Sequence, residues 1–459
     1  MRLAGERLRP LSLAYVLVED AVIVAALAGA VAFAHYGSFA TPHSPVGAAT
    51  ALSLLLGIKG VFYYAGLYDF RHLRPRRAFW TRLGAALAVS AALALALGTA
   101  IRAGPVASRA FLVFFPAGVV LCRTAYEVVG RSPRFKRRLL FLGAGEHARR
   151  TARELLDARS RHYEVVGFLG EDETSLGWRI GQKPVLGTFA DLLRVAEERA
   201  VRTVVVAAED RRKAMPLEAL LTLRLRGVEI VEEPKVHEEI AGKIPIEDLR
   251  PSWLIFSDGF HNTPWRNFTK RTFDVVVAAF GLLLAAPLLP LVALAIRLES
   301  RGPVLYRQRR VGQGGSEFTV FKFRSMRIDA ESQGAPQWAK ERDPRVTRVG
   351  RILRKTRLDE LPQLWNVLEG TMSFVGPRPE RPFFVAELRK RIPFYDQRHA
   401  VKPGLTGWAQ VRFRYGSDEA DAVEKLRYDM FYVKHHSIVF DLRILLDTVR
   451  VVLHGGKAR

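Results

Sequence analysis

The chain has 459 residues, of which 49% are hydrophobic and 25% charged, and its 70 Lys and Arg residues against 46 Asp and Glu residues give a formal net charge of +24. So many apolar side chains exclude an intrinsically disordered chain, and the single cysteine, Cys122, excludes an intramolecular disulfide and any zinc site built on several thiolates. The length predicts about three domains. The charge predicts an anionic partner: nucleic acid, anionic lipid or a phosphorylated substrate.

The first 130 residues are predicted to form a bundle of four membrane-spanning helices. Four nearly uncharged stretches each approach the roughly 20 residues that a helix needs to cross a bilayer. They cover Leu11–Tyr36, Val46–Tyr68, Leu83–Ile101 and Ala110–Val128. Glu19 and Asp20 interrupt the first stretch, where charge is costly. They either lie near a helix end or face other helices, or they make a polar contact within the bundle.

Basic residues flank these stretches on one side of the predicted bundle. They precede the first stretch, fill the loop between the second and third, and follow the fourth, as in Arg7, Arg71, Arg74 and Arg134. The loop of residues 37–45 has no Lys or Arg. The bias of positive charge towards the cytoplasm therefore places both ends of the bundle, and everything that follows, in the cytoplasm.

Residues 137–235 are predicted to form a Rossmann-like α/β domain, because apolar strands alternate with helices through short connections. Gly143 and Gly145 turn the first strand into a helix. This turn either cradles a pyrophosphate at the helix N-terminus or is a tight connection in a regulatory or scaffolding domain. Ala148 replaces a third glycine and favours the second reading. Redox chemistry is disfavoured because the chain lacks a Tyr-x-x-x-Lys pair.

A fifth apolar stretch, Phe273–Ile296, follows a predicted linker at residues 236–265. Pro287 and Pro290 interrupt it, and proline bends a helix because it lacks a backbone donor. We predict a re-entrant hairpin that enters and leaves by the same face, with a fifth span as the alternative. Three polar residues would then lie at the mouth of the hairpin, at the height of lipid phosphates: Lys270, Arg271 and Asp274.

The region after the hairpin contains an acidic pair among basic residues. Asp359 and Glu360 precede Pro362, which fits the first turn of a helix, so Asp359 is expected to be an N-cap. The helix dipole and the neighbouring Arg354, Lys355 and Arg357 are expected to keep Asp359 ionised. One carboxylate would attack phosphorus while the other holds Mg²⁺. The alternative is a capping box with a solvated helix start.

The C-terminal region contains an ordered series of motifs, Phe321–Met326, Gly350–Asn366, Ser373–Pro382, Arg398–Gln410 and Lys425–Asp429. Together they resemble the bacterial sugar transferase family, the monotopic phosphoglycosyl transferases. The resemblance covers about residues 266–459, the predicted catalytic domain, which is expected to be mostly helical. The fold class is thus a membrane protein of mixed α and α/β structure. With its N-terminal parts, the chain resembles the large members that start exopolysaccharide or O-antigen synthesis.

The resemblance implies transfer of a sugar 1-phosphate from a UDP-sugar to polyprenyl (undecaprenyl) phosphate at the bacterial cytoplasmic (inner) membrane, with release of UMP. It implies that Asp359 is the nucleophile of a covalent phosphosugar intermediate and that Glu360, with Asp359, binds Mg²⁺. Six positions match the family's substrate-binding residues: Lys322, Arg324, Arg354, Arg378, Asp429 and Asp441. Pro287 matches the proline that breaks the family's re-entrant helix, although Ala286 stands where the family has serine.

Other functions fit less of the sequence. A membrane-bound nucleotide-sugar dehydratase is disfavoured by the missing Tyr-x-x-x-Lys pair, and an Asp-x-Asp glycosyltransferase by the absence of that motif. A membrane scaffold or nucleic-acid binder leaves the ordered motifs unexplained, so no nucleic-acid partner is expected. A homodimer through the nucleotide-fold domain is a further hypothesis. No motif indicates which sugar is transferred.

Overall fold

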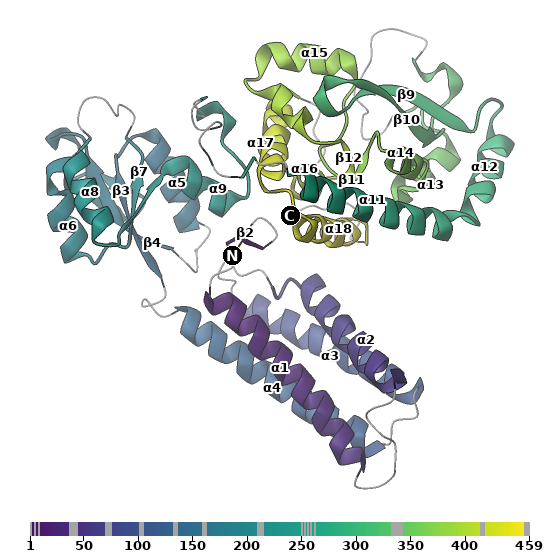
Figure 1. Cartoon of the computed structure of the whole chain (residues 1–459), viewed down its shortest axis with the longest axis horizontal. Coiled ribbons are helices and arrows are strands. Elements are labelled where there is room, and N and C mark those ends of the chain that lie inside the picture. The colour runs from purple at the N-terminus through teal and green to yellow at the C-terminus, as the bar shows by residue number, and fades with distance from the viewer. Residues whose placement is uncertain are drawn as a thin grey trace. The chain divides into compact units, whose positions relative to one another are not determined.

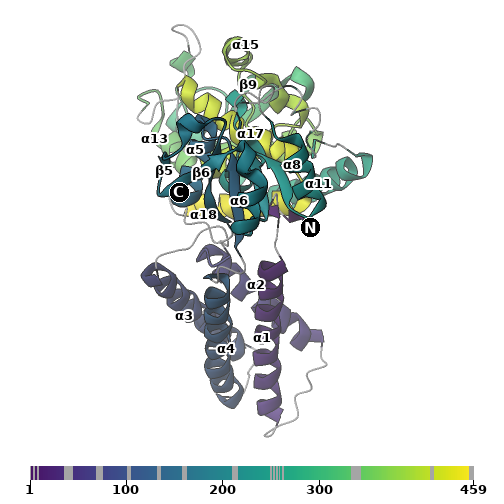
Figure 2. The same ribbon diagram turned by 90° about the vertical axis from the view of Figure 1, so that its left-hand side faces the viewer.

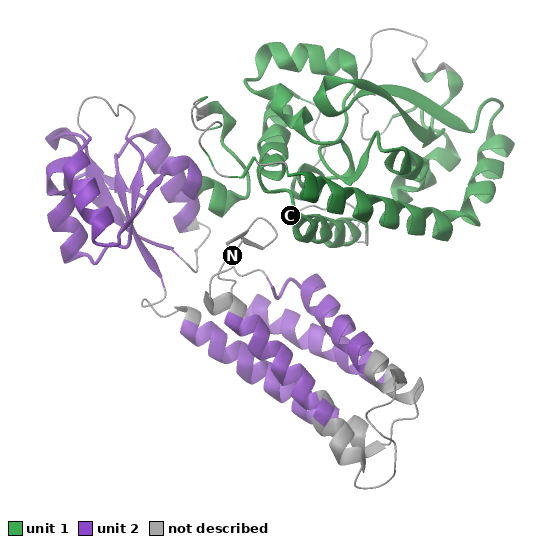
Figure 3. Ribbon diagram, viewed as in Figure 1, with its two compact units in different colours: residues 1–7, 237–459 green, residues 8–236 purple. Residues whose placement is uncertain are grey.

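The computed structural model describes the chain apart from residues 1, 4–5, 8–9, 36–44, 69–75, 101–104, 132–135, 158–162, 209–214, 249–250, 252–253, 255–256, 258, 261–262, 332–342, 414–417 and 454–459. It divides into two compact units, residues 8–236 and residues 1–7 with 237–459 (Figure 3). The loop residues Arg71, Arg74, Arg134 and 37–44, on which the predicted orientation depends, lie outside the described residues.

The first unit begins with four helices, α1 (Pro10–His35), α2 (Pro45–Tyr64), α3 (Arg76–Ala100) and α4 (Pro105–Arg131) (Figure 1). Side chains from all four share one hydrophobic cluster, which includes Ile23, Ile58, Leu83 and Phe115. Among the described residues, Arg77–Ala96 and Phe111–Val129 are long and apolar enough to cross a membrane. Membrane association therefore has support from α3 and α4, while four spans stay a prediction.

A buried carboxylate joins these helices. Glu19 of α1 is 0% exposed. Tyr68 donates a hydrogen bond to its Oε2 at 2.7 Å, Arg123 Nη2 of α4 lies 2.8 Å from its Oε1, and Tyr15 donates to Oε1 as well. Lys59 lies 3.5 Å from Oε2. Glu19 thus faces the other helices and makes the polar contact that the sequence left open.

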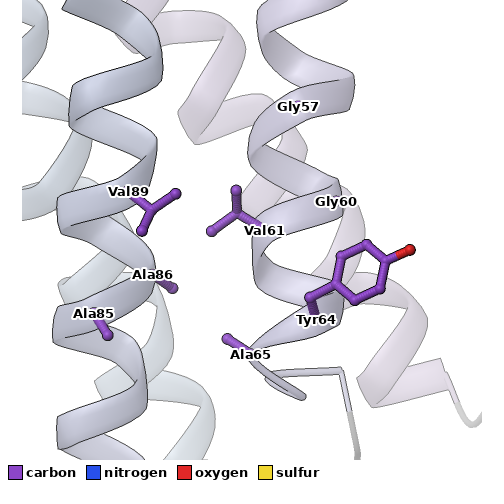
Figure 4. Close-up of a pocket in the computed structure, with 8 residues that line it drawn as sticks. All are labelled: Gly57, Gly60, Val61, Tyr64, Ala65, Ala85, Ala86 and Val89. Carbon is purple, nitrogen blue, oxygen red and sulfur yellow. The ribbon is translucent and has the colours of Figure 1, made fainter. Parts of the chain in front are cut away.

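A pocket of about 470 Å³ lies between α2 and α3 (Figure 4). Small side chains open it, because Gly57 and Gly60 on α2, with Ala65 directly after it, oppose Ala85 and Ala86 on α3. The residues around it carry no charge. This pocket is therefore mainly apolar and offers space to apolar groups.

The second part of this unit is a six-stranded sheet in the order β5-β6-β4-β3-β7-β8. Its strands are β3 (Arg137–Leu142), β4 (Tyr163–Gly170), β5 (Arg179–Ile180), β6 (Lys183–Thr188), β7 (Thr203–Val206) and β8 (Glu229–Glu232). All neighbours run parallel except the short β5. Its helices are α5 (Glu146–Asp157), α6 (Leu192–Glu198) and α8 (Leu217–Leu225), with 3₁₀ turns at Glu173–Ser175 and Phe189–Asp191 (Figure 2).

The strand order confirms a sheet with the predicted Rossmann-like pattern. Leu140 and Leu142 of β3 pack with α6 and α8, while Phe141 points to the opposite face and stacks on Phe168. Such two-sided burial explains why the last four residues of the strand, Leu139–Leu142, are all apolar rather than alternating. The chain order within the sheet reverses beside β3, which is where this fold places ligands.

The conformation of the glycine turn favours the reading as a tight connection. Gly143 has φ +117°, and a Cβ there would lie 2.7 Å from the carbonyl oxygen of Ala207, so only glycine fits. The first turn of α5 carries Glu146, whose negative charge disfavours a phosphate at that helix end. Gly143 is therefore required for close packing of two strand ends, and Gly145 precedes a helix that does not favour an anion.

The second unit is mainly helical, with short strand pairs. Its helices are α11 (Pro264–Ala285), α12 (Leu288–Glu299), α13 (Arg348–Thr356), α14 (Gln363–Glu369), α15 (Pro382–Arg391), α16 (Trp408–Arg412), α17 (Glu419–His435) and α18 (Ile438–Leu453). Its strands are β1 (Arg2–Leu3), β2 (Glu6–Arg7), β9 (Leu305–Val311), β10 (Glu317–Phe323), β11 (Ser373–Val375) and β12 (Gly404–Thr406). The 3₁₀ turns are Ile246–Asp248, Gln313–Gly315, Ile328–Glu331, Leu358–Glu360 and Tyr395–Ala400.

The predicted linker at residues 236–265 is not a free connection where the structure describes it. Helix α9 (Glu233–Ala241) enters it, and Glu238 pairs with Lys434 at 2.7 Å. Ile244 and Ile246 are buried in the main hydrophobic cluster of this unit. The backbone carbonyl of Gly242 accepts a hydrogen bond from Trp408 at 2.8 Å. Much of the segment therefore belongs to the second unit, which corrects the predicted boundary.

Helices α11 and α12 form a bent pair in the place of the predicted hairpin. They meet at an angle of 60°, and Pro287 lies at the break as the N-cap of α12. Because α11 already ends at Ala285, the break forms without a serine at position 286. The bend is therefore present, and a re-entrant path through a membrane stays a prediction.

Candidate functional site

The acidic pair lies in a short 3₁₀ turn between α13 and α14. Arg357 ends α13 with φ +61°, which redirects the chain before the turn Leu358–Glu360. Pro362, not Asp359, is the N-cap of α14, so the expected cap was wrong. Asp359 and Glu360 are 7% and 8% exposed. The alternative of a solvated helix start is therefore excluded as well.

Glu360 is held by two cations. Lys322 Nζ of β10 and Arg378 Nη2 both donate to Glu360 Oε1, at 3.0 and 2.9 Å. Burial alone would raise the pKa of Glu360, but the charges of Arg378 and Lys322 outweigh it and hold that pKa well below its usual range. Burial and the nearby Arg378 lower the pKa of Lys322, despite Glu360. Glu360 is thus a fixed anion at the centre of a positive cluster.

Asp359 has the opposite environment. Its Oδ1 atom is buried and has no hydrogen-bond partner among the described residues. Burial and the adjacent Glu360 raise the pKa of Asp359, and Lys322, Arg354 and Arg357 only partly oppose them. The sequence predicts instead that the nearby cations keep Asp359 ionised. The structure shows that burial prevails, so this carboxylate binds a proton more readily than an exposed one.

The pair has the donor set that a magnesium ion requires. Mg²⁺ commonly takes one or two carboxylates and completes its shell with water and substrate phosphates. Asp359 Oδ1 is unpartnered among the described residues, and the hydrogen bonds of Glu360 all go to Oε1, which leaves Oε2 for another ligand. The described part of the chain contains no group of three or more acidic, His or Cys side chains for a metal. The residues therefore fit a shared ion rather than an all-protein metal site.

The loop that carries Arg378 rests on a buried ion pair that the sequence did not reveal. Arg398 Nη2 donates to the backbone carbonyl of Arg378 at 2.9 Å and to Asp429 Oδ2 at 2.8 Å. Its Nη1 donates to the hydroxyl of Tyr395 at 2.8 Å. Asp429 was predicted to bind substrate, but its contact is with Arg398. We therefore assign Asp429 to the support of the Arg378 loop.

Two other predicted substrate-binding arginines have structural contacts. Arg324 Nη1 and Nη2 donate to the carbonyls of Arg301 and Ser300, at 2.9 and 2.8 Å, directly after α12. Arg354 Nε donates to the hydroxyl of Ser325 at 2.9 Å. Arg354 also contributes to the potential at Asp359, whereas Arg324 fastens the end of the bent helix pair.

The residues predicted at the mouth of the hairpin form a buried network within the unit. Lys270 donates to Asp274 at 3.0 Å and pairs with Asp441 at 2.9 Å, while Asp274 accepts from Ser373 at 3.1 Å. Arg271 donates to the carbonyl of Leu368 at 2.6 Å, at the end of α14. Asp441 thus joins Lys270 rather than the acidic pair. These side chains fix α11 to the catalytic unit, and contact with lipid phosphate stays a prediction.

Comparison with known proteins places this site in a family. The family model described as "Bacterial sugar transferase" matches residues 265–455. The exopolysaccharide production protein PSS of Rhizobium leguminosarum bv. phaseoli is 46% identical over 41% of this chain and 96% of that protein. The chain belongs to the bacterial sugar transferase family. The predicted resemblance is therefore confirmed.

Two further relatives of this bacterial sugar transferase match over a smaller share of their own length. The UDP-N-acetylgalactosamine-undecaprenyl-phosphate N-acetylgalactosaminephosphotransferase of Aeromonas hydrophila is 39% identical over 62% of this chain and 64% of that protein. The UDP-glucose:undecaprenyl-phosphate glucose-1-phosphate transferase of Caulobacter vibrioides is 48% identical over 41% of this chain and 71% of that protein. The chain thus spans less than two thirds of the Aeromonas relative. A second family model, described as a CoA-binding domain, matches residues 64–231.

Proposed function

We propose that this protein transfers a sugar 1-phosphate from a UDP-sugar to undecaprenyl phosphate and releases UMP. The names of its relatives, which specify undecaprenyl-phosphate sugar phosphotransferases, support this reaction. The observation that carries the proposal is the asymmetry of the acidic pair. Glu360 is bound by two cations, whereas Asp359 has a buried oxygen without a hydrogen-bond partner among the described residues.

This asymmetry separates the roles of the two carboxylates. A nucleophile needs an oxygen with a free electron pair, and a carboxylate whose pKa is raised is the more reactive anion once ionised. Asp359 Oδ1 meets both conditions. It attacks the phosphorus that carries the sugar, a P–O bond to UMP breaks, and UMP leaves with that electron pair. An oxygen of undecaprenyl phosphate then attacks the same phosphorus and releases Asp359.

The cations stabilise the charge that develops on phosphorus. Arg378 and Lys322 lie where Glu360 fixes them, and the N–H groups of a guanidinium and of an ammonium group are suitable donors to phosphoryl oxygens. Asp359 and Glu360 would hold Mg²⁺, which when bound neutralises phosphate charge. Because the cations are already in place before substrate binds, little reorganisation is needed during the reaction.

The proposal also covers how the protein is arranged in the membrane. Four helices, α1–α4, cross the bacterial cytoplasmic membrane, the bent pair α11–α12 enters it from the cytoplasmic side, and the acidic pair faces the cytoplasm. The apolar helices α3 and α4 and the 60° bend at Pro287 support this arrangement. A homodimer also belongs to the proposal, and the mass of the protein in nanodiscs tests it.

Replacement of the nucleophile tests the reaction. The purified protein is incubated in nanodiscs with Mg²⁺ and a panel of UDP-sugars, with and without undecaprenyl phosphate, and UMP is measured. We expect Asp359→Asn to lower the rate at least about 10³-fold without lowering the melting temperature, because a neutral side chain tolerates this burial better. The control is Asp396→Asn, which changes a half-exposed acid. Normal turnover by Asp359→Asn would contradict a covalent intermediate, and UDP in place of UMP would contradict phosphosugar transfer.

A further inference from the structure

Gln363 is a buried polar side chain that the mechanism above does not use. It is the first residue of α14 and is 4% exposed. Its Nε2 group has no hydrogen-bond partner among the described residues. Buried donors are almost always satisfied, so an exception calls for an explanation. The explanation we pursue is a ligand that binds there during the reaction.

The backbone places Gln363 on the same side as the acidic pair. Residues 358–360 form a 3₁₀ turn, Leu361 and Pro362 keep right-handed helical angles, and α14 follows without a break. Along such a helical path, residues three and four positions apart are neighbours. Gln363 stands three residues after Glu360 and four after Asp359. The side chain therefore belongs to the same helix face as both carboxylates.

The two unpartnered atoms of this face are complementary to a phosphoryl group. Asp359 Oδ1 is an acceptor without a donor, and Gln363 Nε2 is a donor without an acceptor. A phosphorus atom attached to Asp359 would bring non-bridging oxygens, which are acceptors, to this face. A neutral amide donor can bind such an oxygen. A further lysine or arginine at this position would instead form an ion pair with the carboxylate nucleophile.

A second amide on the same helix shows what a structural role looks like. Asn366, one turn beyond Gln363, is 0% exposed. Its Oδ1 accepts from the backbone N–H of Phe321 at 3.1 Å and its Nδ2 donates to the carbonyl of Thr319 at 2.8 Å. Asn366 thus fastens α14 to β10 with both ends of its amide. Gln363 has a donor that performs no such task.

We infer that Gln363 donates a hydrogen bond to a non-bridging oxygen of the transferred phosphoryl group, and is therefore a substrate-contacting residue of both half-reactions. This inference rests on the proposed function, since it needs a phosphoryl group at Asp359. It predicts an unusual combination for a buried residue. Removal of the donor slows the chemistry, but the folded protein loses no hydrogen bond.

The test compares Gln363→Met with the wild-type protein in nanodiscs. Methionine has similar length and no donor. We expect UMP release in a single turnover, and the following transfer to undecaprenyl phosphate, each to slow by about 100-fold. The slowing should be the same for every UDP-sugar that the wild type accepts, and the melting temperature should stay unchanged or rise. Gln397→Met, on the exposed surface, is the matched control.

Several outcomes would overturn the inference. Wild-type rates in Gln363→Met would show that the donor is not used. A slowing that depends on the sugar would indicate a contact with a sugar hydroxyl instead, and a lowered melting temperature with rates restored at lower temperature would indicate a structural role. In each case the wild type still releases UMP, so the proposed function stands. A wild-type protein that releases no UMP overturns both.

Discussion

Glu19 in the N-terminal helices and Asp359 in the catalytic unit are both buried carboxylates, but their surroundings differ. Glu19 has two tyrosine donors, an arginine at 2.8 Å and a lysine at 3.5 Å. Asp359 has a buried oxygen without a hydrogen-bond partner among the described residues. A buried charge is costly unless it is paired, so full pairing is what a structural carboxylate needs. The missing partner at Asp359 is consistent with a carboxylate that interacts with substrate instead.

The comparison predicts that loss of Glu19 acts on stability. Glu19→Ala leaves Arg123 buried without its anion, and loss of one partner of such a pair costs about 3–5 kcal/mol. We expect a strongly lowered melting temperature and nearly normal UMP release well below it. Asp20→Ala is the control, because Asp20 is about one third exposed and should cost less than about 1 kcal/mol. Equal melting temperatures of Glu19→Ala and Asp20→Ala would contradict the structural role of Glu19, and with it the contrast between Glu19 and Asp359.

A smaller effect is expected from Arg398, a buried residue of the catalytic unit whose charge is paired with Asp429. Arg398→Lys keeps the charge beside Asp429 but cannot make all the bonds that a guanidinium makes. The loop of Arg378 should shift, and UMP release should slow about 10- to 100-fold. Arg389→Lys, which changes an exposed pair with Asp396, should leave the rate unchanged.

A double variant tests whether Arg398 and Arg378 affect the rate of UMP release through the same loop. If Arg398 acts through Arg378, the double variant Arg378→Met with Arg398→Lys should be no slower than Arg378→Met alone. Multiplied effects in the double variant would instead show that Arg398 acts independently of that loop.

The smallest expected effect is on the pH dependence. Attack requires ionised Asp359, whose pKa is raised, so UMP release should fall with acid at a higher pH than an ordinary aspartate would give. Lys322 opposes that rise, so Lys322→Met should move the acid limb further up. Lys355→Met, on the exposed face of α13, should not move it. A limb that moves down in Lys322→Met would contradict the assignment to Asp359.

Stability should depend on pH in opposite ways for the two carboxylates. The lowered pKa of Glu360 adds stability above the ordinary carboxyl value of 4.5, and this is lost as the pH falls towards its folded value. The raised pKa of Asp359 favours the protonated protein, so its contribution weakens as the pH rises through the folded value. Asp359→Asn removes only the second dependence.

The sequence predicted the order of elements and the ionic character of the site, but not every contact. The motifs located Asp359, Glu360, Lys322 and Arg378, and the structure brings Glu360, Lys322 and Arg378 together. Charge patterns alone did not show that burial would outweigh the cations around Asp359. Nor did they show which arginines bind backbone carbonyls, because that depends on long-range packing.

Local rules failed where tertiary structure overrides them. The position of Pro362 indicated a helix that starts at Asp359, but the left-handed conformation of Arg357 sets a 3₁₀ turn first. Residues 236–265 were predicted to be a linker, but apolar residues such as Ile244 and Ile246 fix this segment to the core. The sequence did not single out Gln363 within its motif, since both it and Asn366 are buried and only the missing partner of its Nε2 group distinguishes it.

Strand β10 connects the bent helix pair to the acidic pair. Lys322 binds Glu360, and Arg324, the residue directly after the strand, binds the carbonyls that follow α12. Since we propose that α11 and α12 lie in the bilayer, their depth depends on the thickness of its hydrocarbon layer. A thicker or thinner membrane that displaces α12 would pull on the same strand that positions Lys322. Lipid composition thereby becomes a variable that reaches the chemistry of Asp359.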